Sequence, residues 1–120
     1  MRKLPLYLFI LIALASCGPK RQAKSTIKAF IKENISEKSH YSIEDYGRLD
    51  STRYLTDSII SIMHTNAEKN KAFGNNLQYG KRKDKKKQLK YIPIKMKVYD
   101  QDTTYIFYLT NDLQQVVAFK

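Results

Sequence analysis

The sequence predicts a small α+β domain behind an export signal. Two segments have apolar residues at helical spacing, a strand-like segment lies between them, and the carboxy-terminal third is rich in β-branched and aromatic residues. Helices that stand apart from consecutive strands are typical of an antiparallel sheet rather than of alternating parallel units. We therefore expect a helix, a strand, a second helix and then a three-stranded antiparallel meander.

The amino-terminal residues have the order of a secretory signal peptide. Arg2 and Lys3 precede an apolar run over residues 4–14, and two small residues follow it. This run is shorter than the about 20 residues that a membrane-spanning helix needs. We expect residues 1–16 to be removed during export.

Residues Leu14, Ala15, Ser16 and Cys17 resemble the lipobox of bacterial lipoproteins, in which a branched apolar residue and two small ones precede an invariant cysteine. Only a thiol can carry the thioether-linked diacylglycerol of such proteins. We expect diacylglycerol and an N-acyl chain such as palmitate on Cys17, and no other cofactor. Each buried methylene contributes about 0.8 kcal/mol, so these chains would anchor the protein permanently. The alternative is an ordinary signal peptide that happens to contain a cysteine.

The residues after the cysteine indicate how and where the domain is attached. Residues 18–24 are polar and lack apolar periodicity, so we expect a lipidated cysteine and tether over 17–24 and one folded domain over 25–120. Surface-exported lipoproteins of Bacteroidota carry acidic clusters after the cysteine, whereas this chain carries Gly18 and basic residues. This difference favours the periplasmic face of the outer membrane.

Composition limits the partners and the chemistry of the mature chain. Removal of residues 1–16 takes two of the 22 basic residues and none of the 11 acidic ones, which leaves 104 residues with a formal net charge of +9. This length suits one small domain. An exported chain meets little nucleic acid, so the available partners are anionic lipid or lipopolysaccharide, an acidic glycan or an acidic envelope protein. The alternative is that the basic excess only keeps the protein soluble. With its one cysteine acylated, the chain has no thiol for a disulfide or a metal site.

The first helix is expected over residues 26–35, with Ser25 as its N-cap. Its apolar residues share one face, namely Ile27, Phe30, Ile31 and Ile35. A strand is expected next over residues 41–49, with a bulge at Gly47.

The second helix is expected to start from an N-cap on Asp50 or Ser51 and to fade near residues 73–76, where Gly74 supplies C-cap chemistry. Five apolar residues recur at helical spacing along it: Leu55, Ile59, Ile62, Met63 and Ala67. We expect this stripe to face the core.

A basic segment over residues 77–90 follows the second helix, and we expect it to be a solvated loop or helical extension. Its one acid is Asp84, and its basic residues are Lys81, Arg82, Lys83, Lys85, Lys86, Lys87 and Lys90. Each cation near an anionic membrane contributes about 1 kcal/mol of attraction. The segment is therefore a candidate contact for an anionic surface, and the alternative is a solvated loop without a specific partner.

The carboxy-terminal strands are expected to form the meander. In the first of them, Ile92, Ile94, Met96 and Val98 alternate with more polar residues. Turns are expected at residues 100–102 and 111–112, which leaves strands over 103–109 and 113–119. The strand over 103–109 is apolar on both faces, so we expect it to be central.

Several stretches of the mature chain resemble small Bacteroidota lipoproteins of unknown function. The similar residues are Phe30, Ile31, Lys32, Glu33, Asn34, Tyr41, Ile43, Gly47, Leu49, Asp50, Ser51, residues 94–99, residues 105–109, Asn111 and Asp112. Those relatives carry a proline and an aspartate where this chain has Lys38 and Ser39, and a longer charged hairpin. The resemblance brings no catalytic residues. At the level of fold, the element order is similar to cystatin-like and nuclear-transport-factor-2-like domains.

Other candidate sites have simpler explanations. His40 and His64 lack further ligands at metal-binding spacing, so we expect His64 on a helix surface and no bound metal. Asp100 and Asp102 are expected to serve a turn, because the distal glutamate of a calcium loop is missing. No serine stands in the elbow motif of a hydrolase.

These observations favour a non-enzymatic binding or accessory module that is anchored in the cell envelope. One alternative is a periplasmic inhibitor or immunity protein that neutralises a toxin or hydrolase. Another is a small-ligand carrier or an enzyme with a pocket between sheet and helix. The sequence leaves the oligomeric state open.

Overall fold

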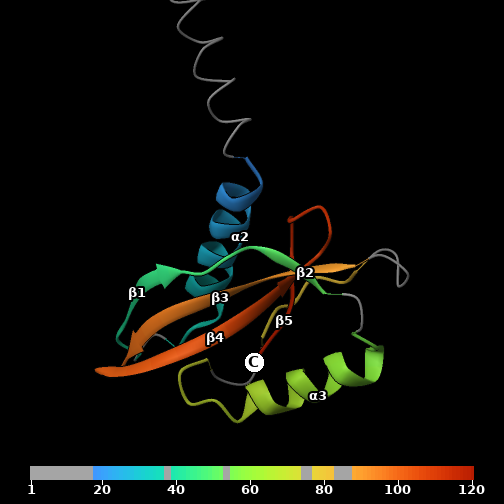
Figure 1. The fold of residues 1–120 in the computed structure, drawn as a ribbon. Helices are drawn as coiled ribbons and strands as arrows, with labels where there is room; N and C mark the ends of the chain where they lie inside the picture. Colours follow the sequence, from blue (N-terminus) through green and yellow to red (C-terminus); the bar gives the residue numbers. More distant parts are fainter. Residues whose placement is uncertain (1–17, 37–38, 53–54, 74–76, 83–87) are drawn as a thin grey trace, which may run out of the picture.

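The computed structural model describes residues 18–36, 39–52, 55–73, 77–82 and 88–120 (Figure 1). Its elements in chain order are α2 (Gly18–Asn34), β1 (Tyr41–Tyr46), β2 (Asp50–Thr52), α3 (Asp57–Glu68), β3 (Leu89–Val98), β4 (Gln101–Leu109) and β5 (Val116–Phe119). In the described residues, two helices pack against one antiparallel sheet of five strands. The α+β fold that the sequence predicts is confirmed.

The sheet is built around β3. This strand pairs with β4 along nearly its whole length, while β1 and β2 pair one after the other with its opposite edge. β5 adds to the far side of β4, so the strand order is β1-β3-β4-β5 with β2 also beside β3. The expected meander is confirmed as β3, β4 and β5. The strand that we expected between the two helices is present as β1 and pairs with β3 in the same sheet.

The larger core cluster lies between α2 and the sheet. The predicted alternation in β3 is confirmed, because Ile92, Ile94 and Met96 are fully buried. Ile27 and Ile31 of α2, also fully buried, belong to the same cluster. Each buried aliphatic side chain of this size stabilises the fold by about 1.5–3 kcal/mol.

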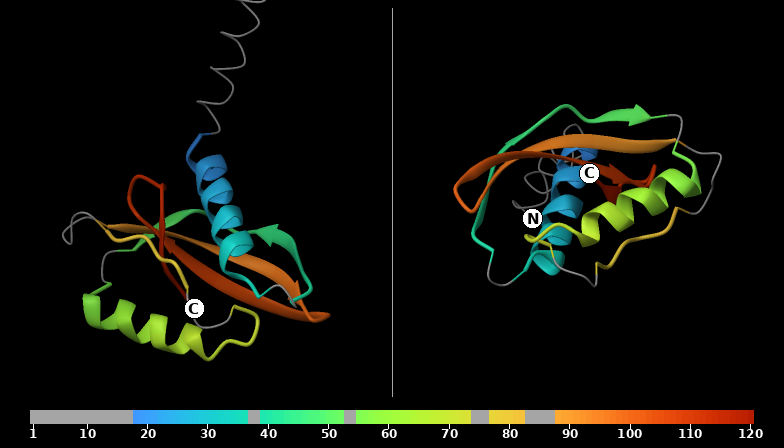
Figure 2. Two further views of the ribbon diagram at one scale, coloured as in Figure 1. Left: turned by 180° about the vertical axis from the view of Figure 1, so that it is seen from behind. Right: turned by 90° about the horizontal axis from the view of Figure 1, so that it is seen from below.

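A smaller cluster joins α3 to the sheet. Ile60 and Met63 of α3 are buried together with Tyr108 and Val117, and α3 lies beside β5 (Figure 2). Neighbouring residues of a strand point to opposite faces, which explains why Phe107 belongs to the larger cluster and Tyr108 to the smaller one. β4 is therefore covered on both faces near its end, as expected of the central strand.

α2 begins at Gly18 rather than near residue 26, so the expected tether over residues 18–24 is instead the first two turns of this helix. Pro19 suits a first turn, because an N–H at that position would lack a helical acceptor. Ala23 stands one turn before Ile27 and is fully buried in the larger cluster. The side chain of alanine is small and stands among polar neighbours, so the sequence pattern does not reveal that Ala23 belongs to the apolar face.

The connection between β1 and α3 also differs from expectation. The expected strand over 41–49 ends at Tyr46, and its bulge lies between Ile43 and Asp45 rather than at Gly47. The N–H of Gly47 donates to the carbonyl oxygen of Pro93 at 2.6 Å, and a Cβ on Gly47 would lie 2.9 Å from that oxygen. Glycine is needed here for close approach to β3.

α3 starts later than expected, and the face that it buries overlaps the expected one only at Met63 and Ala67. Residues 50–52, the expected cap region, pair with β3 as β2, and Thr56 instead caps the helix by accepting a bond from the N–H of Ile59. Ile60, Met63 and Ala67 are buried, whereas Ile59 and Ile62 are 38% and 60% exposed. The helix ends at Glu68, and residues 74–76, where we expected it to fade, lie outside the described residues.

Both turns of the meander lie close to their expected positions. The first occupies Tyr99 and Asp100, which have φ values of 50° and 63°, so β4 already begins at Gln101. Positive φ at both central residues is typical of a two-residue turn that matches the twist of a hairpin. In the second turn, the Thr110 hydroxyl donates to Asp112, and β5 begins only at Val116.

Candidate functional site

The expected anchor residues and part of the basic segment lie outside the described residues. This applies to Leu14, Ala15, Ser16 and Cys17, and to Lys83, Lys85, Lys86 and Lys87. Within the part of the chain that is described, no helix combines the length and the apolarity needed to cross a bilayer.

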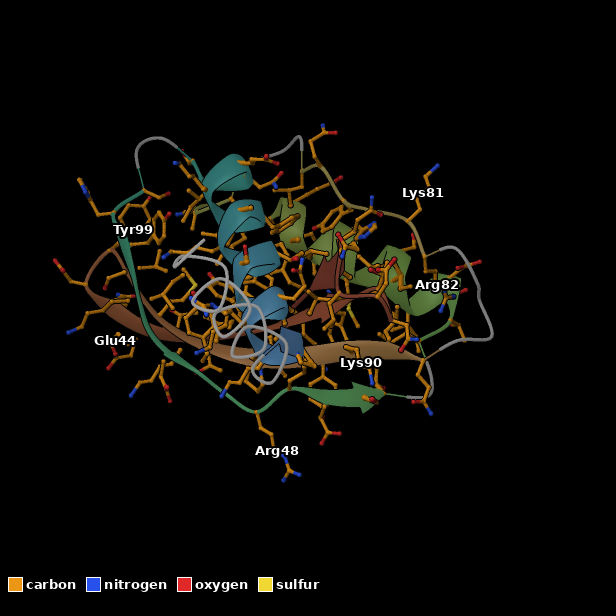
Figure 3. All side chains as sticks on the ribbon, turned by 90° about the horizontal axis from the view of Figure 1, so that it is seen from above. Glu44, Arg48, Lys81, Arg82, Lys90 and Tyr99 are labelled. Carbon is orange, nitrogen blue, oxygen red and sulfur yellow. The ribbon has the colours of Figure 1, made fainter. Side chains whose placement is uncertain are left out.

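The described cations of the basic segment do not form one solvated surface. Lys81 is exposed and points away from the domain, whereas Arg82 turns toward the start of α3 (Figure 3). The Arg82 guanidinium donates to the carbonyl oxygen of Leu55 and forms an ion pair of 2.9 Å with Asp57. Lys90 lies in β3 and donates to the Ser51 hydroxyl at 2.7 Å. The expectation of a solvated segment is therefore wrong for Arg82, whose side chain is only 11% exposed.

The start of this segment is also packed rather than free. The N–H of Gln78 donates to Oδ1 of Asn34, and the N–H of Gly80 donates to the carbonyl oxygen of Val116. The ring of Tyr79 lies 5.5 Å from that of Phe30, between centroids, and joins the larger core cluster. Residues 78–80 thus run alongside β5 and α2. In the sequence, Tyr79 and Gly80 are the two residues that indicate a packed, extended segment here.

His64 is partly buried and packed against its neighbours, whereas we expected it on the helix surface. Its ring stacks on Tyr79, with centroids 3.9 Å apart, and its Nε2 lies 2.7 Å from the carbonyl oxygen of Val117. His40 is exposed at the start of β1, in a different part of the sheet. Among the described residues, no three His, Cys, Asp or Glu side chains gather to hold a metal ion.

A polar groove of about 460 Å³ lies between α2, residues 78–80 and the start of β5. Its lining combines hydroxyl, amide and apolar groups, from Ser25, Thr26, Ala29, Phe30, Glu33, Gln78, Tyr79, Gly80, Gln114, Gln115 and Val116. Glu33 is the one charged residue in this lining, although the protein as a whole is strongly basic. The groove therefore suits a ligand that is neutral or cationic rather than anionic.

Hydrogen bonds fix the walls of the groove. The Thr26 hydroxyl donates to the carbonyl oxygen of Leu113 at 2.7 Å, which ties α2 to the turn before β5. Gly80 permits the close fit on the opposite side, because a Cβ there would lie 2.3 Å from the side chain of Gln115. These contacts within the domain hold the walls in place. No sequence motif marks this groove, since its residues come from three separated segments.

Tyr79 forms the deep wall between the groove and α3. Its hydroxyl oxygen is buried without a hydrogen-bond partner in the described part of the chain. Burial, followed by the charge of Glu68, raises the pKa of Tyr79 to about 12. The phenol therefore stays neutral over the whole physiological range and serves as a packing group.

Comparisons with known proteins give no match: no family model fits the chain, and neither a curated protein nor a solved structure is significantly similar to it.

Proposed function

We propose that the protein is a lipid-anchored lipoprotein of the bacterial cell envelope whose domain acts as a non-enzymatic binding module. The observation that carries this proposal is the sequence of Leu14, Ala15, Ser16 and Cys17 directly before the folded domain. Acyl chains on Cys17 would hold the domain at the outer membrane, facing the periplasm. The resemblance to small Bacteroidota lipoproteins is in keeping with this location.

The polar groove is the surface that we assign to binding. The α2 side of its lining offers the hydroxyl groups of Ser25 and Thr26, and the other side offers the amide groups of Gln78, Gln114 and Gln115. Apolar groups come from Ala29, Phe30 and Val116. Such a lining suits a neutral chain that carries many hydroxyl and amide groups, and a glycan is such a chain. A small-ligand carrier is the second candidate, because this groove lies between α2 and the start of β5, and thus between a helix and the sheet.

Lipidation is tested in cells that are fed a labelled fatty acid. The full chain should incorporate the label and lose the mass of residues 1–16, whereas Cys17→Ala should do neither. Ser16→Ala is the matched control, because it keeps a small residue before the cysteine and should still be labelled. Absence of label from the unmodified chain would overturn the proposed anchor.

Binding in the groove is tested by titration with neutral oligomers of N-acetylglucosamine. We expect Gln115→Ala to weaken the affinity about tenfold and Gln101→Ala, the same change on exposed β4, to leave it unaltered. A polysulfated glycan should not compete. If the neutral oligomers do not bind, or if the sulfated glycan displaces them, the assignment of the groove is wrong.

A further inference from the structure

The start of α2 leaves only a few residues between the proposed anchor and the core. The helix begins at Gly18, the residue after Cys17, and Ala23 is already fully buried. At 1.5 Å per residue, the helix covers only about 7 Å from Gly18 to Ala23. A domain held by this segment cannot swing far from the surface that holds Cys17.

The charge on this part of α2 has one sign. Residues 18–28 contain four cations and no acid: Lys20, Arg21, Lys24 and Lys28. Lys20, Arg21 and Lys28 are exposed, and Lys24 places its ammonium group 5.0 Å from the centre of the Tyr46 ring. Cations near the positive end of a helix dipole are unfavourable in water. An apposed anionic surface would offset this cost.

The fold presents this end of α2 on one side of the molecule. α2 begins far from α3, and the turn between β4 and β5 rises beside its first turns (Figure 1). The bond from Thr26 to Leu113 fixes that turn against α2. The side that faces the anchor therefore consists of the first turns of α2 and residues 110–115, while α3 occupies the opposite side.

We propose that the domain docks on the anionic phospholipid surface of its own membrane through the start of α2, with Lys20 and Arg21 among the head groups. The proposal rests on the proposed lipidation of Cys17 and adds a fixed orientation to it. It assigns the lipid contact to α2 and not to the basic segment over residues 77–90, where Arg82 is engaged within the domain. α3, with exposed Ile59 and Ile62, then faces away from the membrane.

The test uses the full chain, processed in cells and reconstituted in vesicles. Cys17 is the one cysteine of the chain, so an added cysteine is the one thiol that acylation leaves for a fluorophore. Gln114→Cys places the fluorophore near the start of α2, and Asn66→Cys places it on α3. Head-group-linked quencher lipids should quench the label at position 114 at least twofold more than that at position 66 in anionic vesicles.

The ratio of quenching at position 114 to quenching at position 66 also identifies the cations that hold the domain on the membrane. It should fall toward one in neutral vesicles, at high salt and in Lys20→Gln/Arg21→Gln. Lys71→Gln/Lys95→Gln removes two exposed charges elsewhere and should preserve the ratio. Lys71 precedes Ala72, whose carbonyl oxygen accepts from Ser36 beyond the other end of α2, so Lys71 lies far from the proposed contact. Lys95 lies in β3, where it pairs with Asp45 of β1.

Three other results would each reject a different part of the proposal: the docking, the choice of contact, or the anchor. Equal quenching at positions 114 and 66 on an acylated chain would show a freely turning domain and reject the docking alone. A loss of the ratio in Lys81→Gln/Lys83→Gln/Lys85→Gln/Lys87→Gln, but not in Lys20→Gln/Arg21→Gln, would assign the contact to the basic segment. A chain without acyl mass on Cys17 would reject the proposed anchor, and the docking with it.

Discussion

The imidazole of His64 lies flat on the phenol ring of Tyr79, with centroids 3.9 Å apart and planes 12° apart. The Nε2 atom of the same ring is 2.7 Å from the carbonyl oxygen of Val117, and an acceptor at this distance requires the proton on Nε2. One side chain of α3 therefore holds both β5 and the segment that follows α3. This contact explains why residues 77–80 pack against the domain despite the basic run that follows them.

Replacement of His64 should loosen this junction. We expect His64→Ala to lower the free energy of unfolding by about 1–2 kcal/mol, because it removes one hydrogen bond and one stacked ring. His40→Ala is the control, since His40 is exposed, and should stay within about 0.5 kcal/mol of the unmodified protein. Urea denaturation measures both values, and equal effects would contradict the role of His64.

The buried hydroxyl of Tyr79 predicts an unusual tolerance of phenylalanine. A buried polar atom without a partner costs stability, so Tyr79→Phe should leave the free energy of unfolding unchanged or raise it by up to about 1 kcal/mol. Tyr79→Ala should lower it by about 3–5 kcal/mol, because a ring is lost from the core. A clear destabilisation by Tyr79→Phe would mean that the hydroxyl has a partner.

The same residue predicts a loss of stability in alkali. Its pKa is about 12 in the folded protein, against 10.0 for an unperturbed tyrosine, so the folded state holds this proton more tightly than the unfolded state. The contribution of this tighter proton binding to the free energy of unfolding is fully present below pH 10 and is lost as the pH rises through 12. Denaturation midpoints measured from pH 9 to 12 should fall less steeply in Tyr79→Phe than in the unmodified protein.

Arg82 and Lys81 are neighbours in the sequence, but the side chain of Arg82 is packed against the domain and that of Lys81 is exposed. Arg82→Gln should lower the free energy of unfolding by about 1–2 kcal/mol, since it removes a charge-assisted bond to Leu55 and the pair with Asp57. The pair itself contributes little, because the Asp57 side chain is 61% exposed. Lys81→Gln should change stability by less than about 0.5 kcal/mol. Thermal melts of the two variants compare them directly, and similar losses would indicate an unspecific effect of charge.

The fold was largely predictable because its strands obey a simple period. Alternation in β3 and the apolar character of β4 on both faces identified the sheet. The helices were harder, because α3 buries Ile60 while two of its other isoleucines remain exposed, and the sequence cannot say which side meets the sheet. The groove was not predictable, because it forms only where α2, residues 78–80 and residues 114–116 meet.

α3 offers a direct test of which face is buried. Met63→Ala should cost about 2–4 kcal/mol, because Met63 lies in the smaller core cluster. Its neighbour Ile62 is 60% exposed, and Ile62→Ala should cost less than about 1 kcal/mol. Urea denaturation distinguishes the two, and the reverse order would mean that α3 is rotated about its axis.

Ala23 and Gln22 distinguish a packed helix from a tether at the start of the domain. Ala23→Glu should lower the free energy of unfolding by at least about 2 kcal/mol, because a carboxylate would enter the space between α2 and the sheet. Gln22→Glu adds the same charge on the exposed side of the same turn and should be neutral or slightly stabilising, since acids are favoured near a helix start. If this segment were a flexible tether, neither change would alter the free energy of unfolding. Chemical denaturation of the two variants therefore measures how close to Cys17 the folded domain begins, and with it how little freedom the domain has at the membrane.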